Sequence, residues 1–324
     1  MNPGLKAVAA FTLAILAAPG FPQGPAQGYP GRPVRIIVPN ATGGLADICV
    51  RLVAAKLGEA LGQPFLVENR PGAGGTLGTA AAVRAVPDGY TLLAAFDSHA
   101  TNPHLFRKLP YDTLADLAPI SLLVRGPLVL VVHPGLGPTT VSELVQLARS
   151  KPGAINFATV GPGSPARLLV ELLKIEAGIK VTNVAYKGAG LALGDLVGGQ
   201  VDAMFATTPS VRSYYKAGRL RVLAITSEHR SAIAPGVPAM NELYPGFIAE
   251  AWVALLAPAK TPPEIITRLN AEIAKILELP DMKERFADQG LESAGGTPAQ
   301  LDTLIRAEIE RWGKVIRKQK ITLE

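Results

Sequence analysis

Two stretches of the chain share one design, VRIIVPNATGGLAD at residues 34–47 and INFATVGPGSPAR at residues 155–167. In each, an apolar strand ends in a loop with two glycines and leads into a helix. The first backbone N–H groups of such a helix have no partner within it, and the helix dipole is positive at this end. Each corner is therefore a predicted site for a small anion.

The spacing of the two corners indicates how a ligand would be held. They lie about 120 residues apart in a chain of 324 residues, which is long enough for two domains. One carboxylate-bearing ligand, gripped from both sides, is the predicted arrangement. It is typical of a binding protein.

Residues 1–28 are predicted to be a secretory signal peptide. Lys6 is the only charge before Arg32, and an apolar run over residues 7–18 is followed by small residues, glycine and proline. About a dozen residues are too few to cross a bilayer, which takes roughly 20. We expect a soluble periplasmic protein beginning near residues 27–29. Because the single cysteine, Cys49, lies well past the cleavage site, neither a lipid anchor nor an internal disulfide is expected.

The formal charge of +6 falls to +5 once Lys6 is removed with the signal. The excess is spread along the chain, with one local cluster on a helix near the C-terminus. A solvated outer face is the preferred interpretation of this cluster, and nucleic acid is not an expected partner. The cluster comprises Arg311, Lys314, Arg317, Lys318 and Lys320.

After the signal, apolar strands alternate with amphipathic helices. This alternation predicts an α/β fold with a mostly parallel sheet, helices on both faces, and ligands at the carboxyl ends of the strands. Residues 97–102 are predicted to be a loop. Strands are predicted at 34–39, 65–68, 91–96, 129–132, 155–158, 181–185 and 201–205, and helices at 46–61, 76–85, 141–150, 166–177 and 190–197.

Three threonines are predicted to start helices. Thr140 and Glu143 have the spacing of a capping box. Thr261 and Thr297 are each followed by a proline at the predicted first helical position, with an acceptor side chain three residues on.

The chain is predicted to cross between two lobes at residues 125–127 and again near 244–250. Lobe 1 would then contain residues 29–126 and 249–324, and lobe 2 residues 127–248.

Motifs for other chemistries are weak. The glycine run at residues 72–78 has leucine where a dinucleotide fingerprint needs its third glycine, and no Walker sequence is present. The four histidines share no metal spacing, and Ser164 lacks the G-x-S-x-G pattern. We predict no cofactor, no metal and no catalytic residue. A triad assembled from distant residues stays open as an alternative.

Many short stretches together resemble the Bug-type solute-binding receptors of tripartite tricarboxylate transporters. The match covers nearly the whole mature chain, and its specificity comes from the number and order of the stretches. They are YPGRPVR at 29–35, Gly43-Gly44 with Asp47, GQP at 62–64, VENRPGAGG at 67–75, PDGYTLL at 87–93, Asn102-Pro103, LPYD at 109–112, YKG at 186–188 and LVGGQVD at 196–202.

This resemblance implies a type II periplasmic binding fold, in which two Rossmann-like domains joined by two hinge crossovers close on a ligand. It implies a monomer that carries a small organic acid, such as a di- or tricarboxylate or an aromatic acid, to a permease of one large and one small membrane subunit. The implied ligand-binding residues are Asn40, Thr42, Gly43, Gly44, Ala46, Asp47, Ser98, His99, Thr159, Gly161, Gly163, Ser164, Arg167, Tyr186 and Thr207.

Two of these residues have alternative roles. Asp47 could stabilise the positive end of its helix or contact the ligand, then more through its N–H than its carboxylate. Arg167 could be a solvated helix charge or could pair with a ligand carboxylate.

The chain also departs from its relatives. Asn40-Ala41-Thr42 replaces an aromatic and proline segment, Arg167 replaces a histidine and Ala206 replaces an aspartate, which favours a more anionic or longer ligand. Other functional classes stay open: a secreted α/β enzyme using the same cleft, or a sensor domain for a membrane kinase.

Overall fold

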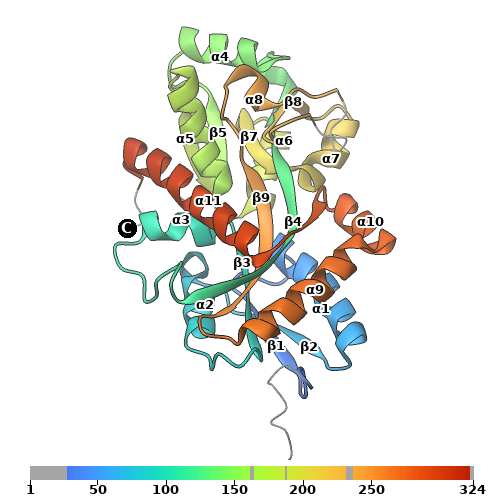
Figure 1. Ribbon diagram of the computed structural model, residues 1–324. Coiled ribbons are helices and arrows are strands. Elements are labelled where there is room, and N and C mark those ends of the chain that lie inside the picture. Colours follow the sequence, from blue (N-terminus) through green and yellow to red (C-terminus); the bar gives the residue numbers. More distant parts are fainter. Residues whose placement is uncertain (1–27, 161–163, 187, 231–235, 322–324) are drawn as a thin grey trace, which may run out of the picture.

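The computed structural model describes residues 28–160, 164–186, 188–230 and 236–321 (Figure 1). Residues 1–27 of the predicted signal peptide, Gly161 and Gly163 lie outside these residues. The described strands form one curled mixed sheet in the order β2-β1-β3-β9-β4-β7-β5-β6, with β8 and β10 also paired to β4. Its strands are β1 (Val34–Val38), β2 (Phe65–Asn69), β3 (Thr91–Phe96), β4 (Leu117–Val132), β5 (Asn156–Val160), β6 (Thr182–Tyr186), β7 (Ala203–Thr207), β8 (Arg221–Ile225), β9 (Glu250–Pro258) and β10 (Glu292–Gly295).

The long strand β4 belongs to both halves of the sheet. Its residues 117–127 pair with β9, and residues 128–132 pair with β7 and β8. We call the half built on β2-β1-β3-β9 lobe 1 and the half built on β7-β5-β6 lobe 2. In Figure 1, β4 and β9 run between the two halves.

The prediction of a mostly parallel sheet is wrong at its centre. The strands of β2-β1-β3 and of β7-β5-β6 are parallel, but every pairing of β4 or β9 is antiparallel. These two strands carry the chain between lobes, so no crossover helix sets their direction. The sequence pattern also misses residues 117–127 of β4, because Pro119, Gly126 and Pro127 interrupt it. Two register shifts accommodate that segment.

The pairing register makes the carboxyl ends of the two lobes' strands point toward each other. Phe96 ends β3 opposite Val253 of β9, which also pairs with Val124 of β4. Thr207 ends β7 opposite Leu128 of β4, and β7 runs in the opposite direction to β3. The four residue steps from Val124 to Leu128 span roughly 13 Å of strand. The parallel neighbours of β3 and β7 therefore end on either side of one gap.

Helices cover both faces of the sheet. In lobe 1 they are α1 (Leu45–Leu61), α2 (Thr76–Val83), α3 (Ser98–Leu105), α9 (Pro263–Glu278), α10 (Pro280–Asp288) and α11 (Pro298–Gln319), and in lobe 2 α4 (Val141–Ser150), α5 (Pro165–Ala177), α6 (Ala189–Val197), α7 (Thr208–Lys216) and α8 (Met240–Leu243). Short 3₁₀ turns cover Ala73–Gly75 and Pro134–Leu136.

Three apolar clusters form the core. One packs α1, α9 and α10 on lobe 1, and another packs α6 and α7 on lobe 2. The third contains buried residues of both lobes, including α5 and α11. In Figure 1, α11 lies between α3 and α5. The C-terminal helix is therefore part of a core that both lobes share.

Local signals explain most helix starts. Thr297 and Gln300 form the predicted capping box. Thr140 accepts from Glu143 N as predicted, but the Glu143 carboxylate accepts from Thr139 rather than Thr140. The prediction for Thr261 is wrong: its hydroxyl donates to Pro258 O at 2.7 Å, so α9 begins one residue later than predicted.

The loop predicted at residues 97–102 is also wrong, because α3 begins at Ser98. Its sequence, SHATNPHL, contains an internal proline and few strong helix formers. Packing against α11 provides the missing stability, and the His104 ring lies 2.8 Å from Ile309 O.

Among the described helices, we find none with the length and hydropathy that a bilayer crossing requires.

Candidate functional site

The loop after β1 is organised around the buried carboxylate of Asp47. Gly43, at φ +80°, donates its N–H to Asp47 Oδ2 at 2.8 Å. Asn69, at the end of β2, donates to Asp47 Oδ1 at 2.9 Å and to Asn40 O at 3.2 Å. Arg51, one turn along α1, pairs with the same carboxylate at 2.9 Å. These bonds fix the shape of the corner.

This network decides what the corner offers a ligand. The Asp47 carboxylate and the Gly43 N–H bind each other, so neither is directed at a solute. The next residue, Gly44, is the N-cap of α1, and no side chain caps this helix. The positive end of α1, at Leu45 and Ala46, is therefore the feature suited to a carboxylate.

Two further segments of lobe 1 are packed beside this corner. A Cβ on Gly75 would lie 3.2 Å from Pro39 O and 3.5 Å from Ser98 Oγ, so the turn before α2 touches both the β1 corner and the start of α3. Asn102 of α3 donates to Gly74 O at 3.0 Å. The structure thus places Ser98 beside the corner that follows β1.

His99 is placed differently from its neighbour. Its side chain is 5% exposed, and its Nε2 is buried without a hydrogen-bond partner among the described residues. Burial lowers the pKa of this imidazole to about 4, although a hydrogen bond with the Thr113 backbone opposes the shift. The ring is therefore neutral and inside lobe 1, which disfavours a ligand contact through the imidazole.

In lobe 2, the predicted residues lie at the carboxyl ends of the parallel strands. Thr159 is buried near the end of β5, with its hydroxyl 3.5 Å from Val184 O. Ser164 is the N-cap of α5 and accepts from Arg167 N at 3.2 Å. Thr207 is the N-cap of α7, which no side chain caps, and its hydroxyl lies 3.2 Å from Ser210 Oγ. Of these helix starts, that of α7 has no side-chain cap, but Pro209 in its first turn has no N–H, and Thr208 and Pro209 pack against Gly290.

Arg167 is neither a solvated charge nor an unengaged cation. Its Nη2 pairs at 2.9 Å with Glu171, whose side chain is 2% exposed. The same carboxylate pairs with Lys174 at 2.7 Å and accepts from Asn183 at 2.8 Å. Because Glu171 is shared by two cations, the cluster keeps one positive charge, and Arg167 Nε is buried without a hydrogen-bond partner among the described residues.

Tyr186 directs its hydroxyl into lobe 2. The O–H donates to Asp195 Oδ2 of α6 at 2.7 Å, and the ring packs against the apolar cluster beneath α6. Partial burial, then the hydrogen bond and the charge of Asp195, raise the pKa of the phenol. The tyrosine therefore supports the loop that follows β6.

The comparisons with known proteins identify the family. The family model for the tripartite tricarboxylate transporter family receptor, TctC, matches residues 49–321. The chain belongs to the TctC receptor family. Protein BugT of Bordetella pertussis is 42% identical to it over 296 residues, which cover 90% of this chain and 91% of that protein.

Solved structures extend the comparison to the fold. An R. palustris protein solved with adipate is 34% identical, with a TM-score of 0.81, covering 91% of this chain and all of that one. MatC from Rhodopseudomonas palustris, solved with bound malate, is also 34% identical, with a TM-score of 0.77, covering 89% of this chain and all of that one. The predicted Bug-type resemblance and two-lobed periplasmic binding fold are confirmed.

Several residues that shape this TctC-family site are missing from the sequence prediction. Asn69 joins two loops of lobe 1, and Asp195 and Glu171 hold predicted site residues in lobe 2. Asn69 has a sequence signal, because it ends a strand within a stretch that carries the family resemblance. The other two lie inside helices, where nothing local distinguishes them from surface acids.

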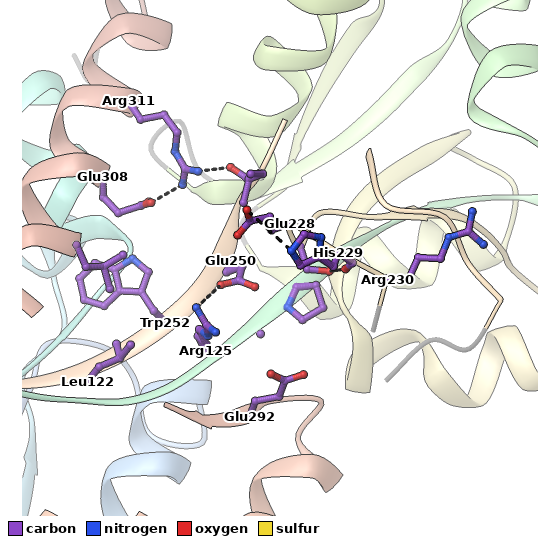
Figure 2. Close-up of a pocket in the computed structure, with 15 residues that line it drawn as sticks. Leu122, Arg125, Glu228, His229, Arg230, Glu250, Trp252, Glu292, Glu308 and Arg311 are labelled. Carbon is purple, nitrogen blue, oxygen red and sulfur yellow. Dashed lines mark hydrogen bonds and ion pairs between the residues drawn. The ribbon is translucent and has the colours of Figure 1, made fainter. Parts of the chain in front are cut away.

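The receptor has a second hollow at the crossing strands, on the side covered by α11 (Figure 2). Its volume is about 410 Å³, and its lining includes none of the predicted ligand-binding residues that the structure describes. Arg125 and Glu250 form an ion pair at 3.8 Å on its wall. Both lobes contribute to the hollow, through residues such as Trp252, Glu308 and Arg311 near α11 and Ser227, His229 and Arg230 after β8.

Proposed function

We propose that this protein captures a small organic carboxylate between its two lobes in the periplasm. It delivers the solute unchanged, as a monomer, to the large and small membrane subunits of a tripartite tricarboxylate transporter. The proposal includes the predicted export signal and the predicted lobe boundaries, residues 29–126 with 249–324 and residues 127–248.

The opposed carboxyl ends of β3 and β7 carry this proposal. In open α/β sheets, ligands bind outside the carboxyl ends of the strands. Here both lobes present these ends to one gap, because Phe96 lies level with Val124 of β4 and Thr207 lies level with Leu128. These two positions are roughly 13 Å apart along β4, a separation that suits a small molecule touching both lobes.

Helix starts support a carboxylate as that molecule. The N-cap residues Gly44 of α1 and Thr207 of α7 leave those helices without side-chain caps. A helix start contributes at most about 2 kcal/mol toward an anion, whereas micromolar binding needs about 8 kcal/mol. One lobe alone is therefore too weak, and hydrogen bonds from both lobes are required. The adipate and malate bound to two relatives are both dicarboxylates.

A ligand screen tests the proposal directly. Thermal shift and calorimetry are measured with adipate, malate, tricarboxylates, aromatic acids and neutral diamides. We expect saturable binding of at least one acid and no binding of the diamides. Equal binding of acids and neutral analogues would contradict the proposal. Turnover of a bound acid, followed over hours by mass balance, would favour the alternative of a secreted enzyme.

A matched pair of variants tests the α1 start. Leu45→Pro removes one backbone N–H at the first helical position, where proline is tolerated, and Gly44 before it has the extended backbone that a following proline needs (φ −73°, ψ 163°). Leu45→Ala shortens the same side chain but keeps the N–H. We expect the proline variant to bind at least about tenfold more weakly than the alanine variant. Equal affinities would remove α1 from the site.

A further inference from the structure

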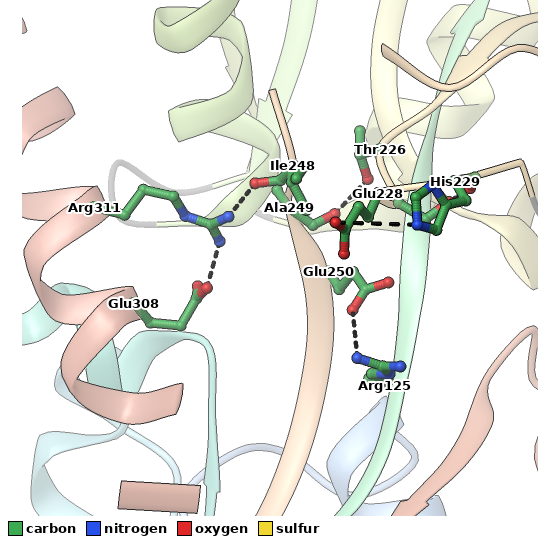
Figure 3. A network of polar contacts seen from close by, with 10 residues as sticks. Arg125, Thr226, Glu228, His229, Ile248, Ala249, Glu250, Glu308 and Arg311 are labelled. Carbon is green, nitrogen blue, oxygen red and sulfur yellow. Dashed lines mark hydrogen bonds and ion pairs between the residues drawn. The ribbon is translucent and has the colours of Figure 1, made fainter. Parts of the chain in front are cut away.

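One side chain of α11 joins the C-terminal helix to the second crossing segment. The Arg311 guanidinium donates through Nη1 to the backbone carbonyl of Ile248 and through Nη2 to Glu308 Oε1 at 2.5 Å. Figure 3 shows Arg311 between these two partners, beside the start of β9. The side chain is 27% exposed, so the cation is partly withdrawn from water.

The Ile248 end of this contact is anchored in lobe 2. Phe247, the preceding residue, is 1% exposed, and its ring stacks on Phe205 of β7 at a centroid distance of 6.2 Å. Phe205 stacks in turn on Phe157 of β5 at 6.3 Å. A displacement of Ile248 therefore disturbs the packing beneath β5 and β7, the strands that carry Thr159 and Thr207 near their carboxyl ends.

The Glu308 end is anchored in lobe 1. Its second oxygen accepts from Trp312 Nε1 at 2.9 Å. Glu308 and Arg311 are also electrostatic neighbours of Asp97, whose carboxylate accepts from Trp252 N at 3.2 Å. Asp97 follows β3 and is the N-cap of α3, so this cluster lies beside the end of β3 that faces the gap.

The crossing strands are also tied together at this level. Thr226, fully buried, has its hydroxyl 2.9 Å from Leu128 N and 2.5 Å from Ala249 O. This link joins β4 to the segment that enters β9 (Figure 3). This link is buried and made to backbone groups, whereas Arg311 contacts the same segment from α11.

We propose that Arg311 is a positioning residue for ligand capture, which holds α11 of lobe 1 on the Ile248 carbonyl and so keeps the two lobes together. This inference rests on the proposed capture between lobes. Removing a contact between lobes lowers the free energy that holds them in one arrangement. Arg311 stabilises the arrangement of the lobes described here, and the proposed capture uses that arrangement, so its loss favours other arrangements and weaker binding, although Arg311 is not among the residues expected to touch the ligand.

The test compares Arg311→Met with Arg306→Met. Arg306 lies on the same helix and carries the same charge, but it pairs at 2.7 Å with Asp302 of its own helix and is 56% exposed. Affinity for adipate and malate is measured by calorimetry. Distances between lobes are measured by double electron–electron resonance on ligand-free protein, with spin labels at Glu59→Cys in α1 and Glu176→Cys in α5 on a Cys49→Ser background.

We expect Arg311→Met to bind at least fivefold more weakly and to show a longer or broader distance distribution, and Arg306→Met to match wild type in both. If Arg311→Met keeps wild-type affinity within twofold and an unchanged distribution, the inference is wrong. If Arg311→Met does not fold, the same criteria apply to Arg311→Lys, which keeps the charge but lacks the fork that reaches two acceptors.

The distance measurement also separates this inference from the proposed function. A shifted distribution in Arg311→Met, with no acid bound by wild type, leaves the positioning role intact and removes the proposed ligand class. Tight wild-type binding of adipate or malate with no effect of Arg311→Met removes only the positioning role.

Discussion

Replacing Asp47 by asparagine is the sharpest perturbation of the lobe 1 corner. The carboxylate accepts three hydrogen bonds, from Gly43 N, Arg51 Nε and Asn69 Nδ2, at 2.8 to 2.9 Å, and its side chain is 3% exposed. Asparagine has one acceptor oxygen, and in the same orientation it presents its NH₂ to the Gly43 N–H. Because the side chain at position 47 is buried, two donors that face each other there cost about 1–3 kcal/mol, and weakening the charge-assisted bonds adds about 1 kcal/mol. We expect a total destabilisation of about 3 kcal/mol at pH 7.

Urea unfolding followed by circular dichroism measures this difference. Asp302→Asn is the matched control, because Asp302 is 37% exposed and pairs with Arg306 on its own helix, so we expect a change below about 0.5 kcal/mol. Both variants keep the length of the side chain and remove one negative charge. A loss under about 1 kcal/mol for Asp47→Asn would refute the view that this carboxylate organises the loop.

The pH dependence provides a second check on Asp47. Burial alone would raise the pKa of this carboxyl, but hydrogen bonds from Arg51, Gly43 and Asn69 outweigh burial and hold the pKa below its ordinary value of 3.8. Because the pKa is lower in the folded protein, the stabilisation is present above pH 3.8 and is lost as the pH falls through the folded-state pKa. The advantage of wild type over Asp47→Asn is therefore expected to shrink at pH 3. A constant difference from pH 7 to pH 3 would contradict this reasoning.

Three further outcomes follow from the site and the crossing segment. Gly43→Ala is expected to lose about 1 kcal/mol in urea unfolding from its left-handed backbone, and not from crowding, since a Cβ there meets no atom within 4 Å. Burial, and then the charge of Glu308, raise the pKa of Asp97 to about 8, so wild-type stability is expected to fall as the pH rises from about 4 through 8, a slope that Asp97→Asn should lack. Tyr186→Phe should bind adipate within about twofold of wild type by calorimetry, because its O–H is donated to Asp195; a tenfold loss would show that this hydroxyl reaches the ligand.

The corners and most helices of this fold can be predicted from local sequence. Strand β1 is almost fully buried and therefore reads as a continuous apolar run. Gly43 and Gly44 mark the turn that follows it, and Thr297 with Gln300 marks the start of α11. These signals act over a few residues, so propensity and capping chemistry determine them.

The interactions that shape the site act over longer separations and leave no local signal. Asp47 accepts a hydrogen bond from Asn69, which is 22 residues away in the sequence, and Arg311 donates one to the carbonyl of Ile248, which is 63 residues away. Strand β4 cannot be predicted from its sequence pattern, because its prolines and glycine interrupt that pattern. These residues are present because a strand that passes from one lobe to the other has irregular pairing where the lobes meet. Helix α3 is stabilised by packing against α11, and its own eight residues carry no sequence signal of that packing.

The predicted site residues show why the motif and the ligand contacts are separate properties. Asp47, Arg167 and Tyr186 each bind another side chain of their own lobe, and His99 is buried. These side chains fix the shape of the loops, while the positive ends of α1 and α7 remain uncapped by side chains. Backbone N–H groups recognise a carboxylate group without regard to the rest of the molecule. In the proposed function, a shared motif would keep the carboxylate-binding helix starts the same in this family. The residues between those helix starts would then select among acids as different as malate and adipate, which are bound to two relatives.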